Sequence, residues 1–378
     1  MIETAADVRV FPHAMLQEIY EQPEAIEAAL RAYLLDGSLN PAPFKDLAEA
    51  LRGHERIVIA ASGSSRHAGL AAEIMLEDLA GLTVDVEYAS EYCYRSTHTL
   101  QSPGVIVISQ SGETADTLAA LREAKARGLS TVAITNHAGS RMATEADASL
   151  PTFAGIEKAI PATKSFTTQL VVLYLTTLYL ARLRGRLTNH SVTALCEQLT
   201  SVVDALRDAL PEWEERASAF ADAIKSTNAV LFLGRGIHYS IAREGALKLK
   251  ESAYVQAEGY PAGELKHGPN ALVGKNAPLV VLATRDANDP DSVLRYEKTL
   301  QLIRDMHAQG AAIFAIISAG DTEIAGITPH TIRVPEASEY LLPVLEVVPL
   351  QLLAYFSAIL RGIDVDNPRN LVKAVVTE

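Results

Sequence analysis

The chain has 378 residues, which at roughly 100–200 residues per domain predicts two or three domains. Hydrophobic residues make up 48% and charged residues 21%, a composition that is typical of a globular protein and excludes a disordered or fibrous one. Acidic residues number 46 and basic residues 33, so the net charge of −13 gives no basic field to hold DNA or RNA, and nucleic acid is not an expected partner.

The first segment, residues 1–53, is predicted to be helical, with helical spacing from Met15 onward and a new helix opened by Pro23. From Arg56 the sequence changes to short apolar runs separated by amphipathic stretches. Runs that are mostly apolar throughout are typical of parallel strands in a sheet covered on both faces. In the first set these strands are expected at 57–60, 84–88, 105–108 and 131–134.

A second set of apolar runs follows a polar helical region and is expected to form strands at 229–233, 279–282 and 312–317. In both sets a glycine-containing turn follows the first strand and the spacing to the next strands is similar, which predicts an internal duplication. We therefore predict an α/β fold with two tandem doubly wound parallel-sheet domains. The predicted boundaries are 1–53 for the helical N-terminal segment, 54–186 for the first domain, 187–228 for a helical connector, 229–362 for the second domain and 363–378 for a C-terminal tail.

Two stretches are apolar enough to be tested as membrane spans. The stretch 170–180 is too short, and 341–360 is interrupted by Pro343, Glu346 and Pro349, so both are predicted to be buried helices. The N-terminus has no signal-peptide pattern, and the two cysteines, Cys93 and Cys196, suit a reducing compartment. The expectation is a cytoplasmic protein with no membrane partner.

Hydroxyl-rich turns follow two strands of the first predicted domain. The run 109–114, Ser-Gln-Ser-Gly-Glu-Thr, leads into a helix expected to begin at about Thr114, and a second such turn occupies 62–65. Because the carboxyl ends of parallel strands lie at one edge of a sheet, two helix N-termini and several hydroxyl groups would meet there. This arrangement fits a phosphate, and the alternative is that the Ser and Thr residues are only helix N-caps.

A nucleotide-binding domain is the main competing interpretation. Glu87 stands where a ribose-binding acid would, but 62–67 and 234–239 lack the full set of fingerprint glycines, and no Walker A loop is present. Metal-ligand spacing and a Gly-x-Ser-x-Gly elbow are also absent, so neither a metal nor a cofactor is expected. The phosphate is predicted to belong to a small metabolite, bound once per chain, because the matching turn at 283–288 has fewer donors and adds Asp286.

Five longer motifs, in order along the chain, resemble the sugar isomerase domain family, and within it the isomerase half of the glucosamine-6-phosphate synthases. These motifs lie at 109–117, 162–170, 244–251, 263–269 and 364–373, and the resemblance runs from about Met15 to the end of the chain. It implies two sugar isomerase domains, a C-terminal tail over the active site and a sugar phosphate as substrate.

The resemblance also implies roles for individual residues. The residues that would bind the phosphate are Ser65, Ser109, Gln110, Ser111 and Thr114. The residues that would line the sugar are Ser64, Ile160, Thr163 and Val372. Ala162 stands where the family usually has a serine, which leaves the preference between glucosamine and galactosamine open.

Four residues would carry the chemistry according to the same resemblance. Glu251 would move a proton between C1 and C2, and Lys248 would assist it, although by spacing alone Glu244, Lys248 and Glu251 favour a solvated salt-bridge face. His267 would open the sugar ring in the site of a partner subunit, which implies a homodimer. Lys373 would form a Schiff base with the open-chain ketose.

The predicted reaction is deamination of an amino sugar phosphate: glucosamine 6-phosphate plus water gives fructose 6-phosphate plus ammonia. The synthases have a glutaminase domain whose cysteine follows the initiator Met, whereas Ile2 follows Met1 here, so glutamine is not the expected nitrogen source. One alternative is a synthase-like enzyme that uses free ammonia or a separate glutaminase. Another is a sugar-phosphate-sensing module of the same fold, which would need the serine turns but not Glu251, His267 or Lys373.

Overall fold

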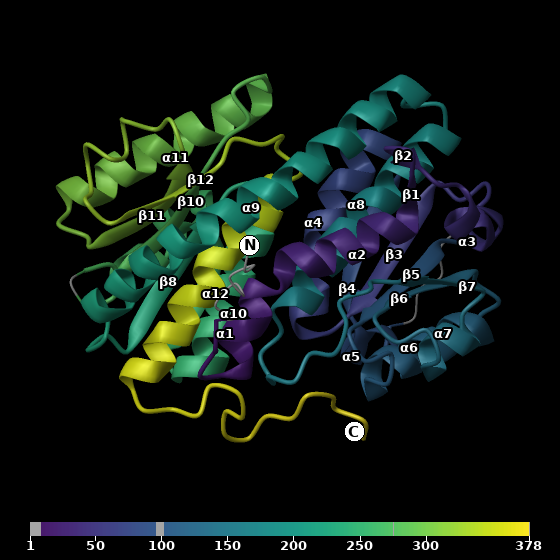
Figure 1. Cartoon of the computed structure of the whole chain (residues 1–378), viewed down its shortest axis with the longest axis horizontal. Helices are drawn as coiled ribbons and strands as arrows, with labels where there is room; N and C mark the ends of the chain where they lie inside the picture. The colour runs from purple at the N-terminus through teal and green to yellow at the C-terminus, as the bar shows by residue number, and fades with distance from the viewer. Residues whose placement is uncertain (1–8, 96–101, 275, 378) are drawn as a thin grey trace, which may run out of the picture.

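The computed structural model describes residues 9–95, 102–274 and 276–377. It consists of two α/β halves, each built on a parallel sheet, with long helices between them and a tail that runs along one edge of both (Figure 1). The chain enters through α1 (Ala14–Tyr20), α2 (Gln22–Tyr33), the short hairpin β1 (Leu34–Leu35) and β2 (Ser38–Leu39), η1 (Ala42–Phe44) and α3 (Lys45–Ala50). Pro23 lies in the first turn of α2, where its missing N–H costs no hydrogen bond.

The first sheet has the strand order β4-β3-β5-β6-β7, and every pair is parallel. Its strands are β3 (Arg56–Ala61), β4 (Thr83–Tyr88), β5 (Gly104–Ser109), β6 (Thr131–Thr135) and β7 (Ala148–Pro151). Its helices are α4 (Gly63–Ala80), α5 (Ala89–Tyr92), α6 (Ala115–Ala126), α7 (Arg141–Glu145) and α8 (Lys164–Leu183). This is a doubly wound sheet, whose ligand crevice lies where the connections from β3 and β5 diverge.

The second sheet repeats this order as β9-β8-β10-β11-β12, again with parallel pairs. Its strands are β8 (Ala229–Gly234), β9 (Gln256–Pro261), β10 (Leu279–Ala283), β11 (Ile313–Ser318) and β12 (Thr331–Val334). The helical elements of this half are α9 (Asn189–Ala223), α10 (His238–Ala253), η2 (Ala262–His267), η3 (Pro269–Leu272), α11 (Pro290–Ala308) and α12 (Leu342–Leu360). The identical strand order confirms the predicted pair of doubly wound domains.

Three edge strands, β7, β9 and β12, were not predicted. β7 and β12 are four residues long and alternate between buried and half-buried positions, so neither forms an apolar run. β9 contains Gln, Glu and Gly, and Gly259 is required because a Cβ there would lie 2.6 Å from the Cα of Arg243 on α10. These three edge strands are recognised by their pairing rather than by an apolar sequence.

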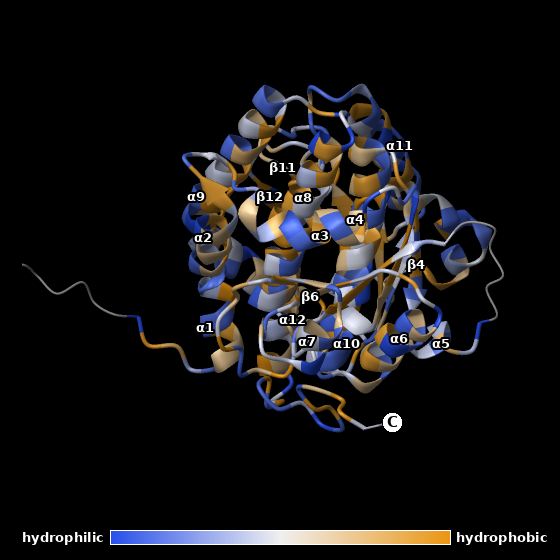
Figure 2. Ribbon diagram, turned by 90° about the vertical axis from the view of Figure 1, so that its right-hand side faces the viewer, coloured by the Kyte–Doolittle hydropathy of each residue, from blue (hydrophilic) through white to orange (hydrophobic). Residues whose placement is uncertain are grey.

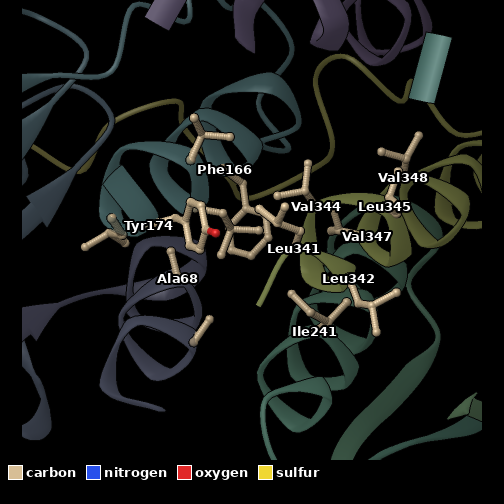
Figure 3. Close-up of a cluster of buried hydrophobic side chains, with 14 of the residues drawn as sticks. Ala68, Phe166, Tyr174, Ile241, Leu341, Leu342, Val344, Leu345, Val347 and Val348 are labelled. Carbon is tan, nitrogen blue, oxygen red and sulfur yellow. The ribbon is translucent and has the colours of Figure 1, made fainter. Parts of the chain in front are cut away.

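One large hydrophobic core is shared by the two halves. Side chains from α4, α8, α10 and α12 meet between the sheets, including Phe166, Tyr174, Ile241 and Val344 (Figure 3). A smaller cluster lies between each sheet and its outer helices. It includes Leu121 of α6 in the first half and Ile303 of α11 in the second. Figure 2 shows the same distribution, with strands mainly hydrophobic and helices divided between hydrophobic and hydrophilic residues.

The helices α8 and α12 are long and apolar enough to cross a membrane by length and composition alone. In each of them, 89% of the most apolar window is buried inside the protein. They therefore have the property of core helices, and their apolar sequences are accounted for by the shared core.

Candidate active site

A cleft of about 170 Å³ lies at the carboxyl ends of β3 and β5. Its residues come from five segments: the turn after β3, the turn after β5, the loop before α8, the second half of α10 and the tail. The lining residues are Ser62, Ser64, Ser65, Ile108, Ser109, Gln110, Ser111, Thr114, Thr117, Ile160, Ala162, Lys248, Glu251, Leu371, Val372 and Lys373. Every predicted site residue except Thr163 and His267 is among them.

The turn after β5 is held in shape by its own hydroxyl groups. Ser109 Oγ lies 2.9 Å from Thr114 Oγ1 and accepts the N–H of Gly112 at 3.2 Å, and Ser111 Oγ accepts the N–H of Glu113 at 3.1 Å. Gly112 has φ +66, and a Cβ there would lie 2.1 Å from Ser140 Oγ, so the position requires glycine. α6 begins at Ala115, next to the predicted start at about Thr114, and the Thr114 side chain makes no capping hydrogen bond to the helix.

Two helix N-termini face the cleft. α4 begins at Gly63, directly after the lining residue Ser62, and α6 begins at Ala115, directly after the lining residue Thr114. Each N-terminus carries a partial positive charge, which favours an anion, although the first N–H of α6, on Ala115, is donated to a carbonyl of the tail. The arrangement suits a phosphate without requiring an arginine.

The face of α10 that carries Glu244, Lys248 and Glu251 is inaccessible to solvent along most of its length. Lys248 is 1% exposed and Glu244 is fully buried, so the interpretation as a solvated salt-bridge face is wrong. The Nζ atom of Lys248 lies 2.6 Å from Glu251 Oε2 and 3.5 Å from Glu244 Oε1. The three residues do share one helical face, but α4 packs against α10 and brings Ser64 and His67 to Glu244.

These charges are coupled to the first half. Ser64 Oγ donates to Glu244 Oε1 at 2.8 Å, and His67 Nδ1 lies 2.8 Å from Glu244 Oε2. Burial opposes the charged form of Lys248, but the carboxylates of Glu251 and Glu244 together raise the pKa of its ammonium above the usual value. Lys248 is therefore a fixed cation between two carboxylates.

The tail brings Lys373 to the wall of the cleft. Its Nζ donates to Glu157 Oε2 at 2.5 Å and to the carbonyl oxygen of Ala159 at 2.6 Å. Although burial of Glu157 opposes ionisation, the charge of Lys373 lowers the pKa of this carboxyl, and the hydroxyl of Ser165 contributes by donating at 2.7 Å. The tail also crosses the turn after β5, where the N–H of Ala115 donates to the carbonyl of Val375 at 2.9 Å.

Two predicted residues lie elsewhere. Thr163 is fully buried behind the wall and donates its N–H to Glu157 Oε1 at 2.9 Å rather than lining the cleft. His267 is exposed at the end of η2 and does not line the cleft of its own chain. Glu157 and His67 were not anticipated, because neither stands in a motif whose spacing points to a partner.

The corresponding edge of the second sheet is filled by a buried charge network. His238 lies 3.3 Å from Glu339 Oε1 and 2.8 Å from Glu346 Oε1, and Arg295 donates to Glu339 at 2.9 Å. Outside it lies a cleft of about 370 Å³ whose lining includes Asp286, the acid expected to repel phosphate. Among the described ranges, no group of three or more His, Cys, Asp or Glu side chains is arranged to hold a metal ion.

Comparison with known proteins shows the family to which this chain belongs. The SIS domain family matches residues 50–179 and 223–361, and the chain belongs to this family. The expected resemblance to the synthases is also confirmed. The chain is 42% identical over 371 residues, or 97% of its length, to glutamine–fructose-6-phosphate aminotransferase (isomerizing) of Chlorobaculum tepidum, of which it covers 59%. It is 43% identical to the enzyme of the same name from Bordetella parapertussis, covering 99% of this chain and 60% of that one.

The solved structures show the same fold. The C-terminal domain of glucosamine-fructose-6-phosphate aminotransferase from Francisella tularensis has a TM-score of 0.89 and 37% sequence identity, covering 96% of this chain and 100% of that one. Glucosamine-6-phosphate deaminase from Thermotoga maritima has a TM-score of 0.70 with 23% identity, covering 96% and 99%, which supports the fold alone. The chain spans about 60% of the length of the curated relatives it matches.

Proposed function

We propose that this chain catalyses isomerisation coupled to deamination of a 2-amino sugar phosphate, converting glucosamine 6-phosphate and water into fructose 6-phosphate and ammonia. The observation that carries the proposal is the content of one cleft: a hydroxyl-rich turn between two helix N-termini, the Glu251 carboxylate, and the Lys373 amine. A sensing module needs only the first of these three. An isomerising deaminase uses all of them.

The first steps are proton transfers on an anchored substrate. The turn after β5 and Ser65 hold the phosphate, and His267 of the partner subunit moves the ring proton that opens the sugar. Glu251 then takes the proton from C2 while one proton of the substrate's ammonium group passes to O1, which gives an enolamine. Glu251 returns its proton at C1, which converts the enolamine into an iminium at C2. Lys248 holds the Glu251 carboxylate by the 2.6 Å contact while Glu251 acts first as the base and then as the acid.

The last steps release ammonia. The neutral amine of Lys373 adds to C2 of the iminium, ammonia leaves, and water hydrolyses the resulting Schiff base to the ketose and the free lysine. Lys373 must first give up a proton, and the Glu157 carboxylate at 2.5 Å is an acceptor within reach. Family resemblance assigns four residues to the sugar: Ser64, Ile160, Thr163 and Val372. Of these, Thr163 would act indirectly, through its hydrogen bond to Glu157.

The direction of the reaction depends on which nucleophile meets the C2 imine. Water is the solvent, whereas ammonia at neutral pH is mostly the non-nucleophilic ammonium ion. With no other nitrogen donor supplied, hydrolysis of the C2 imine is therefore the favoured outcome. The second candidate is the reverse amination of fructose 6-phosphate, and the names of the relatives at 42% and 43% identity favour it.

In the deciding experiment, the purified protein is incubated with glucosamine 6-phosphate, and ammonia and fructose 6-phosphate are both assayed. The proposed reaction should form the two products in equal amounts. Formation of both supports deamination. If neither product forms, while fructose 6-phosphate with ammonium gives an amino sugar, the function is amination rather than deamination. Tight binding of the sugar phosphate with no conversion in either direction would establish the sensing module instead.

The assignment of His267 to a partner's site has a separate test. Glu251→Gln and His267→Asn variants, each inactive alone, are unfolded, mixed and refolded together. If the site is shared, mixed dimers contain one intact site and regain turnover, approaching about a quarter of the wild-type value for random pairing. Mixtures that remain inactive, despite mixed dimers being detected by mass spectrometry, would place His267 in its own chain's site.

A further inference from the structure

Three segments that are distant in sequence form a closed ring of contacts beside the cleft. They are α1, the loop 157–160 and the tail residues 366–373, and we call their contacts the ring. The carboxylate of Asp366 accepts the N–H of Ala14 and of Met15, each at 2.8 Å, and so caps the N-terminus of α1. The carbonyl of the same aspartate accepts the N–H of Ile160 at 2.9 Å.

The ring is completed by Glu18 on α1. Its side chain is 3% exposed, and its carboxylate accepts the N–H of Lys158 and the N–H of Ala159, the latter at 3.3 Å. The same stretch of loop holds the tail lysine, through the Glu157 carboxylate and the Ala159 carbonyl. The tail thus fixes α1, α1 fixes the loop, and the loop fixes Lys373.

A buried carboxylate is a costly way to fill this position. Burial, with the nearby Glu157 charge adding to it, raises the pKa of Glu18 to about 7. A glutamine would pack in the same volume without that cost, but its NH₂ group would replace the Oε2 atom that lies 3.3 Å from the Ala159 nitrogen, so two donors would face each other there. What the carboxylate supplies is the ability to accept from two consecutive backbone donors.

We propose that Glu18 is a positioning residue for Lys373, so that the helix α1, which lies outside the two stretches matched to the SIS family, sets the place of the reacting amine. Its effect on turnover rests on the proposed function, in which Lys373 reacts at C2. Its effect on the place of the amine does not. Glu18 itself touches neither the cleft nor any group assigned to the sugar.

The test compares Glu18→Gln with Glu49→Gln, a control on the exposed surface of α3 that makes no ion pair with the described residues. Both are made in the full chain. Three quantities are measured: ammonia release, borohydride trapping of the Lys373 adduct with fructose 6-phosphate, and the affinity for glucitol 6-phosphate, which has no carbonyl to react. Glu18→Gln is expected to lower kcat and the trapping rate by about 10- to 100-fold, as expected for a displaced reacting group, and to change the affinity by less than about 2-fold. Glu49→Gln should match the wild type in all three.

A fourth measurement does not depend on catalysis. Labelling of Lys373 by an amine-acylating reagent, quantified by mass spectrometry against the exposed Lys45, reports how firmly the loop holds the amine. Labelling is expected to rise several-fold in Glu18→Gln. If the wild type forms no adduct and no ammonia, the proposed function fails, and the labelling result still decides the inference. Labelling and trapping equal to those of the wild type would overturn the inference and leave the proposed function intact.

Asp366→Asn provides a second route if Glu18→Gln fails to fold. It weakens the same ring at the other end of α1, so it should raise Lys373 labelling in the same way. In the double variant the two effects should be less than additive, because the residues act through one ring. Fully additive effects would show that the two contacts act independently and would also overturn the inference.

Discussion

Replacement of Glu251 by glutamine tests the proposed base directly. The amide has nearly the shape of the carboxylate but cannot accept a proton. General-base catalysis contributes about 10²- to 10⁴-fold, so kcat for ammonia release should fall by that factor, equivalent to roughly 3–5 kcal/mol of activation free energy. Exchange of the C2 hydrogen in heavy water, followed by NMR, should fall in parallel because it reports the same proton transfer.

The structure predicts that the protein will survive this change. Lys248 loses the carboxylate at 2.6 Å but keeps Glu244 at 3.5 Å, and the amide oxygen of the substituted side chain can still accept from it. The loss of stability should therefore stay below the roughly 3–5 kcal/mol that follows when a buried charge is left without any partner. The Glu251 side chain is 23% exposed, which further limits the cost.

The assay pairs turnover with binding. The phosphate is held by the turn after β5, so calorimetry should give an affinity for fructose 6-phosphate within about 3-fold of the wild type. Glu297→Gln, on the exposed side of α11, is the matched control and should behave as the wild type. Turnover of Glu251→Gln within about 2-fold of wild type, or a loss of binding as large as the loss of turnover, would refute the assignment of Glu251 as the base.

Three further changes test other parts of the structure. Ser111→Ala removes a hydroxyl donor to the phosphate and should weaken calorimetric binding of fructose 6-phosphate by about 10- to 100-fold, with exposed Ser226→Ala as control; equal affinities would contradict the phosphate assignment. Gly112→Ala should lower the free energy of unfolding, measured in urea, by roughly 1–3 kcal/mol more than Gly128→Ala does. Both glycines have positive φ (+66 and +73), but only at Gly112 would a Cβ meet Ser140 and Thr135, so similar losses would disprove the steric argument. Burial opposes protonation of His238, but Glu346 and Glu339 raise its pKa to about 10. Its stabilising effect is therefore complete below the ordinary histidine pKa of about 6.5 and is lost as the pH rises through 10. The free energy of unfolding should exceed that of His238→Gln by roughly 3–5 kcal/mol at low pH and by less as the pH rises, and a difference that is constant from about pH 6 to 10 would contradict this prediction.

The parts of the fold that were predictable are those in which local sequence reports burial. Strands such as β5, in which every residue is buried, appear as apolar runs, and the hydroxyl-rich turns directly after β3 and β5 could be placed at one sheet edge from topology alone. The edge strand β9 could not be predicted in this way, because its stability comes from pairing with β8 and from the passage of α10 over Gly259.

The less predictable parts of the site depend on contacts between distant segments. Glu244 was expected to be solvated by its spacing, and only the packing of the two halves shows that Ser64 and His67 reach it across about half the chain. Glu18 and Glu157 stand in stretches with no recognisable chemistry, and the contacts of Glu18 with Lys158 and of Glu157 with Lys373 each join residues more than 100 positions apart. Family resemblance located the residues in the cleft, but it did not locate the groups that hold them.

The shared core between α4, α8, α10 and α12 has a consequence for how the two halves divide their tasks. In the proposed reaction, the first half contributes the phosphate cradle and the second half contributes Glu251 through α10. Duplication therefore leaves neither half with a complete site, so the affinity for the substrate's anionic end and the proton transfer between C1 and C2 are encoded in different copies of one ancestral unit. Each property can then change by mutation in its own copy while the common core keeps the two in register.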